Sequence, residues 1–189
     1  DIYLTFDHME TDLHAAIRAN ILGDVHKQYI MWQTLKALKY MHSAMLLHRD
    51  MKPSNLLLNS ECLMKVADFG LARSLQKTTQ NVLTDYVATR WYRAPELLTE
   101  AQYYGPAVDV WSVGCIMAEL LGRKPLFQGK DYMHQLQLIV EALGTPTDRE
   151  MEFITNPAAK AAIKTRLKAS KRIPMATLLP DGDPLALDL

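Results

Sequence analysis

One short run of the chain holds three groups suited to a single reaction: His48-Arg49-Asp50-Met51-Lys52-Pro53-Ser54-Asn55. Asp50 offers a carboxylate that can orient an attacking hydroxyl and accept its proton. Lys52 offers a cation for developing negative charge, and Asn55 offers an oxygen ligand for Mg²⁺. Phosphoryl transfer needs these three groups, and their span of six residues lets one rigid loop hold them around a common point.

A second run, Asp68-Phe69-Gly70, follows the first. Its carboxylate is a hard oxygen ligand suited to Mg²⁺, and Gly70 permits a backbone turn that a side chain would resist. Alone, this tripeptide is common in ordinary turns. The pattern His-Arg-Asp-x-Lys-x-x-Asn is far more specific, with a random expectation of about one in a million per start site. The two runs together therefore indicate a site for phosphoryl transfer.

Hydrophobic periodicity predicts that mainly α-helical elements position these loops. Helices are predicted over about 25–42, 107–121 and 131–143, with shorter helical stretches at 13–17, 158–168 and 184–189. Two apolar runs, 56–58 and 63–67, predict a small β-hairpin, and residues 2–6 predict a strand. The polar segment 68–96 has little periodicity, which is typical of a functional connection.

The composition gives no sign of a nucleic-acid or membrane partner. Lys plus Arg and Asp plus Glu both number 21, so the formal net charge is zero. No apolar run approaches the roughly 18 residues that a membrane helix needs. We therefore expect neither nucleic acid nor membrane among the partners.

At this point the chain resembles the eukaryotic protein kinases over essentially all 189 residues. The resemblance implies that Asp50 is the catalytic base, that Asn55 and Asp68 are the Mg²⁺ ligands, and that ATP is the co-substrate. It also implies that Lys52 touches the transferred phosphate, and lysine at this position favours Ser and Thr as acceptors. Ala94-Pro95-Glu96 matches the end of the activation segment in this family.

Further roles come from the same resemblance. Asp7 and Met9 match the positions whose backbone binds adenine, Asp12 the neighbour of the ribose, and Leu57 the apolar floor under the ring. Asp109 matches an aspartate that anchors the backbone of the catalytic loop, although an ordinary helix-capping role is an alternative. His48 is expected to be a packed residue that supports the loop, and the other histidines receive no chemical role.

Several family elements have no counterpart in the sequence. It contains no Gly-x-Gly-x-x-Gly, no Val-Ala-x-Lys strand and no partner glutamate helix. Residues 1–189 are therefore expected to form the hinge and the C-terminal lobe of a kinase domain, incomplete at both ends and lacking the N-terminal lobe. Such a chain is expected to transfer no phosphate on its own.

Thr84-Asp85-Tyr86, just before the run that ends in Ala94-Pro95-Glu96, resembles the doubly phosphorylated lip of mitogen-activated protein kinases. Each phosphate would add nearly two negative charges that arginines can bind. The resemblance assigns four receivers: Arg49 and Arg73 for phospho-Thr84, Arg90 and Arg93 for phospho-Tyr86. Asp85 differs from the usual middle residues, so an upstream kinase and autophosphorylation both stay open as activators, with a slight similarity to the atypical extracellular-signal-regulated branch.

The predicted function is phosphorylation of Ser or Thr in protein substrates, within signal transduction in the cytoplasm or nucleus. The resemblance to proline-directed kinases implies a twisted backbone at Ala88 whose carbonyl cannot accept a substrate N–H. Proline after the target residue would then be favoured, because it has no N–H to leave unsatisfied. Docking-motif proteins are expected partners. The alternatives are a cyclin-dependent-type kinase, which Tyr86 disfavours, and a non-catalytic docking module, which Asp50 and Asp68 disfavour.

Overall fold

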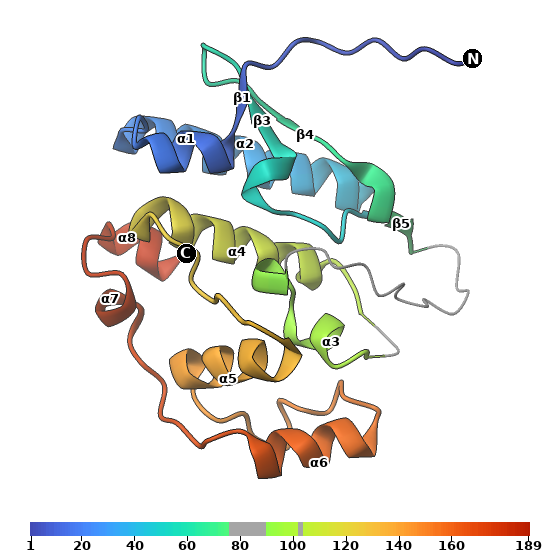
Figure 1. Ribbon diagram of the computed structural model, residues 1–189, viewed down its shortest axis with the longest axis vertical. Coiled ribbons are helices and arrows are strands. Elements are labelled where there is room, and N and C mark those ends of the chain that lie inside the picture. The colour runs from blue at the N-terminus through green and yellow to red at the C-terminus, as the bar shows by residue number, and fades with distance from the viewer. Residues whose placement is uncertain (76–89, 102–103) are drawn as a thin grey trace.

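Helices dominate the described part of the chain, as the periodicity predicts. The computed structural model describes residues 1–75, 90–101 and 104–189 (Figure 1). Its helices are α1 (Leu13–Ala19), α2 (Asp24–Ser43), α3 (Pro95–Leu98), α4 (Ala107–Gly122), α5 (Tyr132–Leu143), α6 (Pro157–Arg166), α7 (Met175–Leu178) and α8 (Pro184–Asp188). Its strands are β1 (Thr11–Asp12), β2 (Leu46–Leu47), β3 (Leu56–Leu58), β4 (Met64–Val66) and β5 (Arg73–Ser74). Short 3₁₀ turns form at Pro53–Asn55, Phe69–Leu71 and Arg90–Tyr92.

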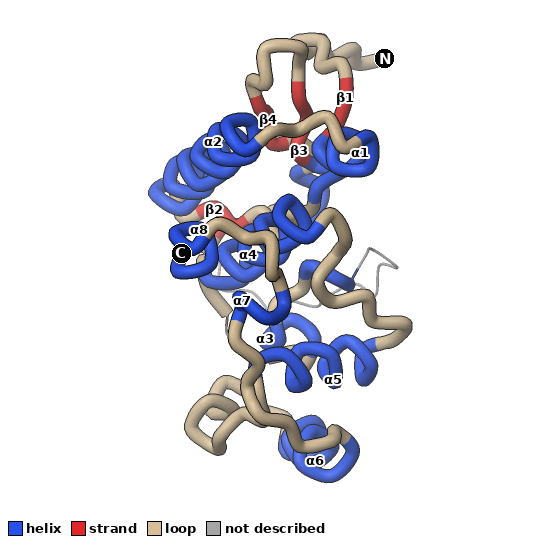
Figure 2. Tube along the Cα trace, turned by 90° about the vertical axis from the view of Figure 1, so that its left-hand side faces the viewer, coloured by secondary structure: helices blue, strands red, loops and turns tan. Residues whose placement is uncertain are grey.

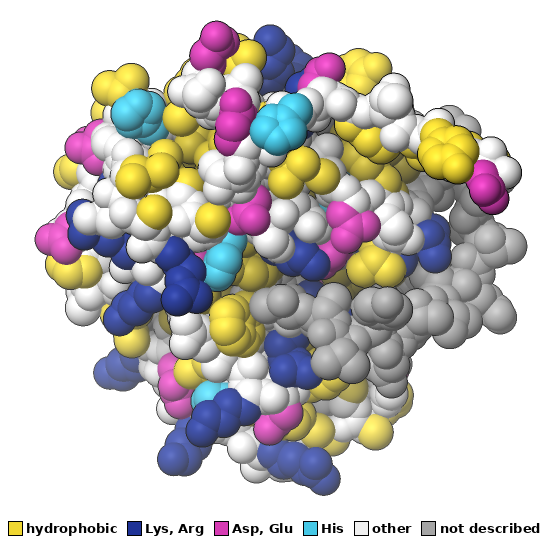
Figure 3. Space-filling view, turned by 45° about the horizontal axis from the view of Figure 1, so that its top comes forward, with side chains coloured by type: hydrophobic (Ala, Val, Ile, Leu, Met, Phe, Trp, Pro, Cys, Tyr) yellow, Lys and Arg dark blue, Asp and Glu magenta, His cyan; other side chains and the backbone are white. Residues whose placement is uncertain are grey.

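The elements are stacked from the strands at one end to α6 at the other. Figure 1 shows α1, α2 and the strands above α4, with α5 and α6 below it, and Figure 2 shows the same order from the side. Helix α2 packs directly on α4. Acidic, basic and hydrophobic side chains are interspersed on the face shown in Figure 3, in keeping with the balanced composition.

Helix α4 is the central element, as its apolar sequence predicts. Nine of its residues are buried, and Val108, Asp109 and Ile116 have no exposed surface at all. The helix ends at Gly122 and is followed by a left-handed residue, Arg123, at φ 59°. Gly122 packs closely, since a Cβ there would lie 3.0 Å from the Leu179 side chain.

The predicted hairpin is confirmed. Strands β3 and β4 pair antiparallel, with Leu57 opposite Lys65, and the Asn59 side chain closes the turn by accepting hydrogen bonds from the Glu61 and Leu63 amides at 3.1 and 2.9 Å. The third strand of this sheet is β1, whose Asp12 lies opposite Leu57.

The predicted strand at residues 2–6 is wrong. Residues 1–10 form no regular element, and Ile2, Tyr3, Leu4 and Phe6 are 74–90% exposed. An extended segment becomes a strand only when its backbone groups pair with another strand. In the described part of the chain the segment finds no such pairing, and the strand that does form, β1, lies beyond it at Thr11–Asp12.

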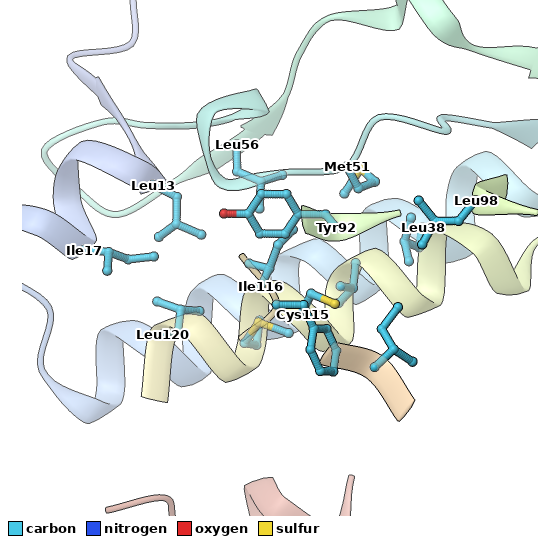
Figure 4. Packing of buried hydrophobic residues seen from close by; sticks show 14 of the residues in the cluster. Leu13, Ile17, Leu38, Met51, Leu56, Tyr92, Leu98, Cys115, Ile116 and Leu120 are labelled. Carbon is cyan, nitrogen blue, oxygen red and sulfur yellow. The ribbon is translucent and has the colours of Figure 1, made fainter. Parts of the chain in front are cut away.

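One hydrophobic core joins α1, α2, the loop that follows β2, and α4. Figure 4 shows Tyr92, together with Ile116 of α4, in the middle of this core, with Leu13 of α1 on one side and Met51, together with Leu38 of α2, on the other. Met51 is 1% exposed. Because it follows Asp50 directly, its burial holds the middle of the candidate catalytic loop against the core.

Gly129 is a position where the packing requires glycine. A Cβ there would lie 2.6 Å from Cα of Gln135, which belongs to α5 and is fully buried. We expect Gly129→Ala to lower the free energy of unfolding by about 1–3 kcal/mol through overpacking. Urea denaturation measures the change.

Gly114 provides the matched control. It is exposed on α4, and a Cβ there would meet nothing within 4 Å. Gly114→Ala should leave stability unchanged or raise it by up to about 1 kcal/mol, because alanine is the better helix former. Equal effects of the two substitutions would contradict the packing around Gly129.

Candidate active site

A buried carboxylate fixes the backbone of the candidate catalytic loop. Asp109, on α4, accepts hydrogen bonds from the amides of His48 and Arg49 at 2.9 and 2.8 Å. His42, at the end of α2, lies 2.9 Å from the same carboxylate through Nε2. The predicted anchoring role of Asp109 is therefore confirmed, and the ordinary helix cap is not what this side chain forms. These contacts tie α2, α4 and the loop together at one point.

Within the loop, the side chains of Lys52 and Asn55 converge on Asp50. Lys52 Nζ lies 2.7 Å from Asp50 Oδ2, and both side chains are less than a fifth exposed. Asn55 Nδ2 donates to the Asp50 backbone oxygen at 2.8 Å and to Oδ2 at 3.2 Å. The structure thus brings together the carboxylate, the ammonium group and the amide that the sequence singles out.

His48 packs beneath the surface and supports the candidate catalytic loop, as expected. Its side chain is fully buried, and Nε2 lies 3.0 Å from the Ala67 backbone oxygen. Its ring meets Phe69 edge-to-face, with centroids 5.0 Å apart. His48 therefore couples the loop to the second motif, which begins at Asp68.

Asp68 lies at the same end of the hairpin as Asn55. The β3–β4 ladder pairs Leu56 with Val66, and the Ala67 amide donates to the Asn55 backbone oxygen at 2.9 Å. Asp68 comes directly after that pair, with a left-handed backbone at φ 62°. Its Oδ1 accepts from the Gly70 amide at 3.2 Å, which orients the exposed carboxylate.

The oxygen chemistry of this pair fits a divalent cation of the Mg²⁺ type. The Asn55 amide nitrogen is committed to Asp50, so the amide orientation presents Oδ1 as the available hard ligand. One carboxylate and one amide oxygen leave most coordination positions to water and phosphate, as Mg²⁺ prefers. Asn55 and Asp68 are the residues that would hold the ion.

Of the four predicted nucleotide-binding residues, Leu57 is the middle residue of β3, and Asp12 and Lys65, the ion-pair partner of Asp7, lie opposite it. Asp12 lies opposite Leu57 in the ladder, and its carboxylate also caps α1 by accepting from the Ala15 amide at 2.8 Å. Asp7 pairs with Lys65, the residue opposite Leu57 on the other side, and this hydrogen bond and charge lower the pKa of the exposed Asp7 carboxyl. Met9 lies on the irregular segment between Asp7 and β1 and is partly buried.

The predicted phosphate-binding arginines fall into two separate groups. Arg49 has a left-handed backbone at φ 66°, donates through Nε to the Leu71 backbone oxygen at 2.8 Å, and contacts the Tyr104 hydroxyl. Arg73 lies on β5 and donates to its neighbour Ala72 at 2.8 Å. Arg90 and Arg93 both reach Tyr132 on α5. Thr84, Tyr86 and Ala88 lie outside the described residues.

A buried polar pair supports the segment that carries Arg90 and Arg93. The Tyr92 hydroxyl donates to Glu119 on α4, and both residues are buried. Burial raises the pKa of both groups above their ordinary values, and the hydrogen bond from Tyr92 offsets part of the rise for Glu119. Ser112 adds a second link by donating to the Tyr92 backbone oxygen at 2.7 Å.

Three residues at the site were missed by the sequence reasoning: His42, Tyr104 and Tyr132. Each acts through a partner 39–67 positions away along the chain. Periodicity and short motifs describe near neighbours only, so no local signal marked these residues. The sequence predicts no role for His42, whereas the structure shows that its side chain contacts the Asp109 carboxylate.

The sequence was compared with protein-family models and with curated proteins. The model of the protein kinase domain family matches residues 1–174. "Extracellular signal-regulated kinase 2" of Dictyostelium discoideum is 56% identical over 194 residues, which cover all of this chain and 52% of that protein. A mitogen-activated protein kinase of Fusarium vanettenii is 55% identical over 191 residues, and mitogen-activated protein kinase 4 of rice is 52% identical over 190, with 54% and 51% of those proteins covered.

The chain therefore belongs to the protein kinase family, and its relatives place it among the mitogen-activated protein kinases. It spans about half the length of the curated relatives it matches. Among the described residues, none of the helices has both the length and the apolar character needed to cross a membrane.

Asp109→Asn tests the anchor directly. The asparagine would offer one acceptor oxygen where the aspartate offers two, so one of the buried donors loses its partner. We expect the free energy of unfolding to fall by about 1–3 kcal/mol. Hydrogen exchange of the His48 and Arg49 amides should accelerate as well.

Asp183→Asn is the matched control for this substitution. Asp183 caps α8 from an exposed position, and asparagine caps a helix about as well as aspartate. Its effect should stay within about 0.5 kcal/mol. If the Asp109 and Asp183 variants were equally stable and equally protected, the anchoring role would be contradicted.

Proposed function

We propose that residues 1–189 supply the hinge and the C-terminal, helical lobe of a mitogen-activated protein kinase that phosphorylates Ser or Thr in protein substrates with ATP and Mg²⁺. The observation that carries the proposal is the convergence of Lys52 and Asn55 on Asp50, with Asp68 at the adjacent end of the hairpin. Family membership makes phosphoryl transfer the expected chemistry for this arrangement.

In this proposal Asp50 acts as the base. Two donors, Lys52 and Asn55, hold its Oδ2, which fixes the carboxylate and leaves Oδ1 to accept the proton of a substrate hydroxyl. As that proton moves to Asp50, the hydroxyl oxygen bonds to the γ-phosphorus of ATP. In the same step the bond between the γ-phosphorus and the β-phosphate oxygen breaks, and ADP leaves.

Lys52 and the metal ion would compensate the negative charge of the phosphates. The Lys52 ammonium, 2.7 Å from Asp50 Oδ2 at rest, is within reach of a phosphoryl group placed next to the base. When bound at Asn55 and Asp68, Mg²⁺ would neutralise charge on the ATP phosphates. Leu57 would form the floor under adenine, with Asp7 and Met9 beside it and Asp12 near the ribose.

Phosphorylation of Thr84 and Tyr86 is the proposed activating event. Arg49 and Arg73 would bind the first phosphate, and Arg90 and Arg93 the second, because guanidinium groups match phosphate oxygens in geometry and charge. An upstream kinase or autophosphorylation would supply the modification. Protein substrates and docking-motif proteins would be the partners, in the cytoplasm or nucleus.

The activity is tested in a chimera in which this chain replaces the matching 52% of the Dictyostelium relative. The activated chimera should phosphorylate a Ser/Thr protein substrate, and Asp50→Asn should lower kcat by about 10²–10⁴ by removing the base. Asp24→Asn, an exposed change on α2, should leave the rate unchanged. Thermal unfolding confirms that the variants are equally folded.

The chain alone forms the second arm of this experiment. It should transfer no phosphate, because its sequence contains neither a Gly-x-Gly-x-x-Gly loop nor a Val-Ala-x-Lys strand. A chimera whose rate is indifferent to Asp50→Asn would overturn the proposed mechanism. If the isolated chain transferred phosphate and Asp50→Asn abolished that activity, only the expectation that the chain needs a separate N-terminal lobe would be overturned.

Proline direction is tested with two peptides that differ only in proline or alanine after the target serine. The proline peptide should have a kcat/KM about 10-fold higher or more, since an unsatisfied N–H costs about 1–3 kcal/mol. Steady-state kinetics of the activated chimera measure the ratio. Equal values for the two peptides would rule out the preference.

A further inference from the structure

Tyr132 contacts two arginines at once, through two different parts of its side chain. The guanidinium carbon of Arg90 lies over its ring, 5.4 Å from the centroid. Arg93 Nη1 donates to its hydroxyl oxygen at 3.1 Å. The ring face attracts one cation and the hydroxyl oxygen accepts from the other, and neither contact neutralises an arginine.

The turn that precedes Tyr132 is itself fastened to the arginine segment. Trp91 Nε1 donates to the Gly129 backbone oxygen at 3.2 Å. The fully buried Gln135 accepts from the Gly129 amide at 2.9 Å and donates to the Trp91 backbone oxygen at 3.3 Å. These hydrogen bonds therefore fix the position of Tyr132 relative to the segment that carries Arg90 and Arg93.

Within the described part of the chain, one donor of Arg90 has no hydrogen-bond acceptor. Its Nη1 donates to the Lys130 backbone oxygen at 3.1 Å, yet Nε is buried and has no hydrogen-bond partner among the described residues. A buried N–H without an acceptor costs free energy, and a bound ion is one of the reasons for which native structures keep such a group. The two guanidinium groups lie at one tyrosine, so the missing partner is best supplied by an anion.

We propose that Tyr132 is a positioning residue that holds Arg90 and Arg93 together as a binding pair for a phosphate monoester. A carboxylate in its place would hold the arginines as firmly but would cancel the charge that attracts phosphate. A tyrosine positions both side chains and preserves their charge. That the phosphate belongs to Tyr86 rests on the proposed function, whereas the positioning role itself does not.

The test is a titration of the isotopically labelled 189-residue chain with phenyl phosphate, in which NMR monitors the arginine Nε–H resonances. The Arg90 resonance should shift with saturation. Tyr132→Leu removes both contacts and should weaken binding about 5-fold or more. Tyr132→Phe keeps the ring but loses the acceptor for Arg93, so binding should weaken by less, about 2-fold.

Tyr40→Leu is the matched control, since Tyr40 is a 79% exposed tyrosine on α2, and its binding should equal that of the unmodified chain. If Tyr132→Leu does not fold, as a circular dichroism melt would show, Tyr132→Phe carries the comparison. Joint replacement of Arg90 and Arg93 by glutamine should abolish binding.

The outcomes separate this inference from the proposed function. Loss of binding in the arginine variant together with unchanged binding in both Tyr132 variants would overturn the positioning role and leave the proposed function standing. Absence of any shift in the unmodified chain would also overturn it. The third outcome is that the affinity for phenyl phosphate depends on Tyr132 while the phosphorylation rate of the chimera is unchanged by Asp50→Asn. That result would contradict the proposed function and leave the positioning role intact.

Discussion

The structure depends on one buried carboxylate. Asp109 has no exposed surface, and a charge in such a place is tolerated only when hydrogen bonds compensate its desolvation. The His48 and Arg49 amides and the His42 ring supply that compensation. The same bonds fix the backbone of the candidate catalytic loop relative to α2 and α4. The groups that compensate the burial of Asp109 are therefore also the groups that position this loop.

Backbone conformations that are unfavourable by themselves persist around this anchor. Arg49 and Asp68 both adopt left-handed conformations, at φ 66° and 62°, without being glycine. Such residues survive where the surroundings over-determine them, and they gather at functional sites. The Arg49 amide is held by Asp109, and the Asp68 carboxylate receives the Gly70 amide. In these conformations the Arg49 side chain contacts Leu71 and Tyr104, and Asp68 follows directly after the end of the hairpin.

Much of this could be predicted from the sequence, because the signals are local. The helices follow apolar periodicity, the hairpin follows two apolar runs joined at Asn59, and the loop motif sets the order of Asp50, Lys52 and Asn55. The failures are equally physical. Residues 2–6 have strand composition but form no strand, because pairing is a tertiary property. The contacts of His42 and Tyr132 join segments 67 and 39 residues apart, beyond any short motif.

Under the proposed function, the anchored loop and the hairpin bring Asn55 and Asp68 to one metal ion. A crystal structure of the chimera with Mn²⁺ and a non-hydrolysable ATP analogue tests this arrangement, because Mn²⁺ takes oxygen ligands like Mg²⁺ and is located by its anomalous scattering. We expect an anomalous peak bound by Asn55 Oδ1 and the Asp68 carboxylate, with Asp50 facing the γ-phosphate. A metal bound elsewhere, or by only one of the two side chains, would contradict it.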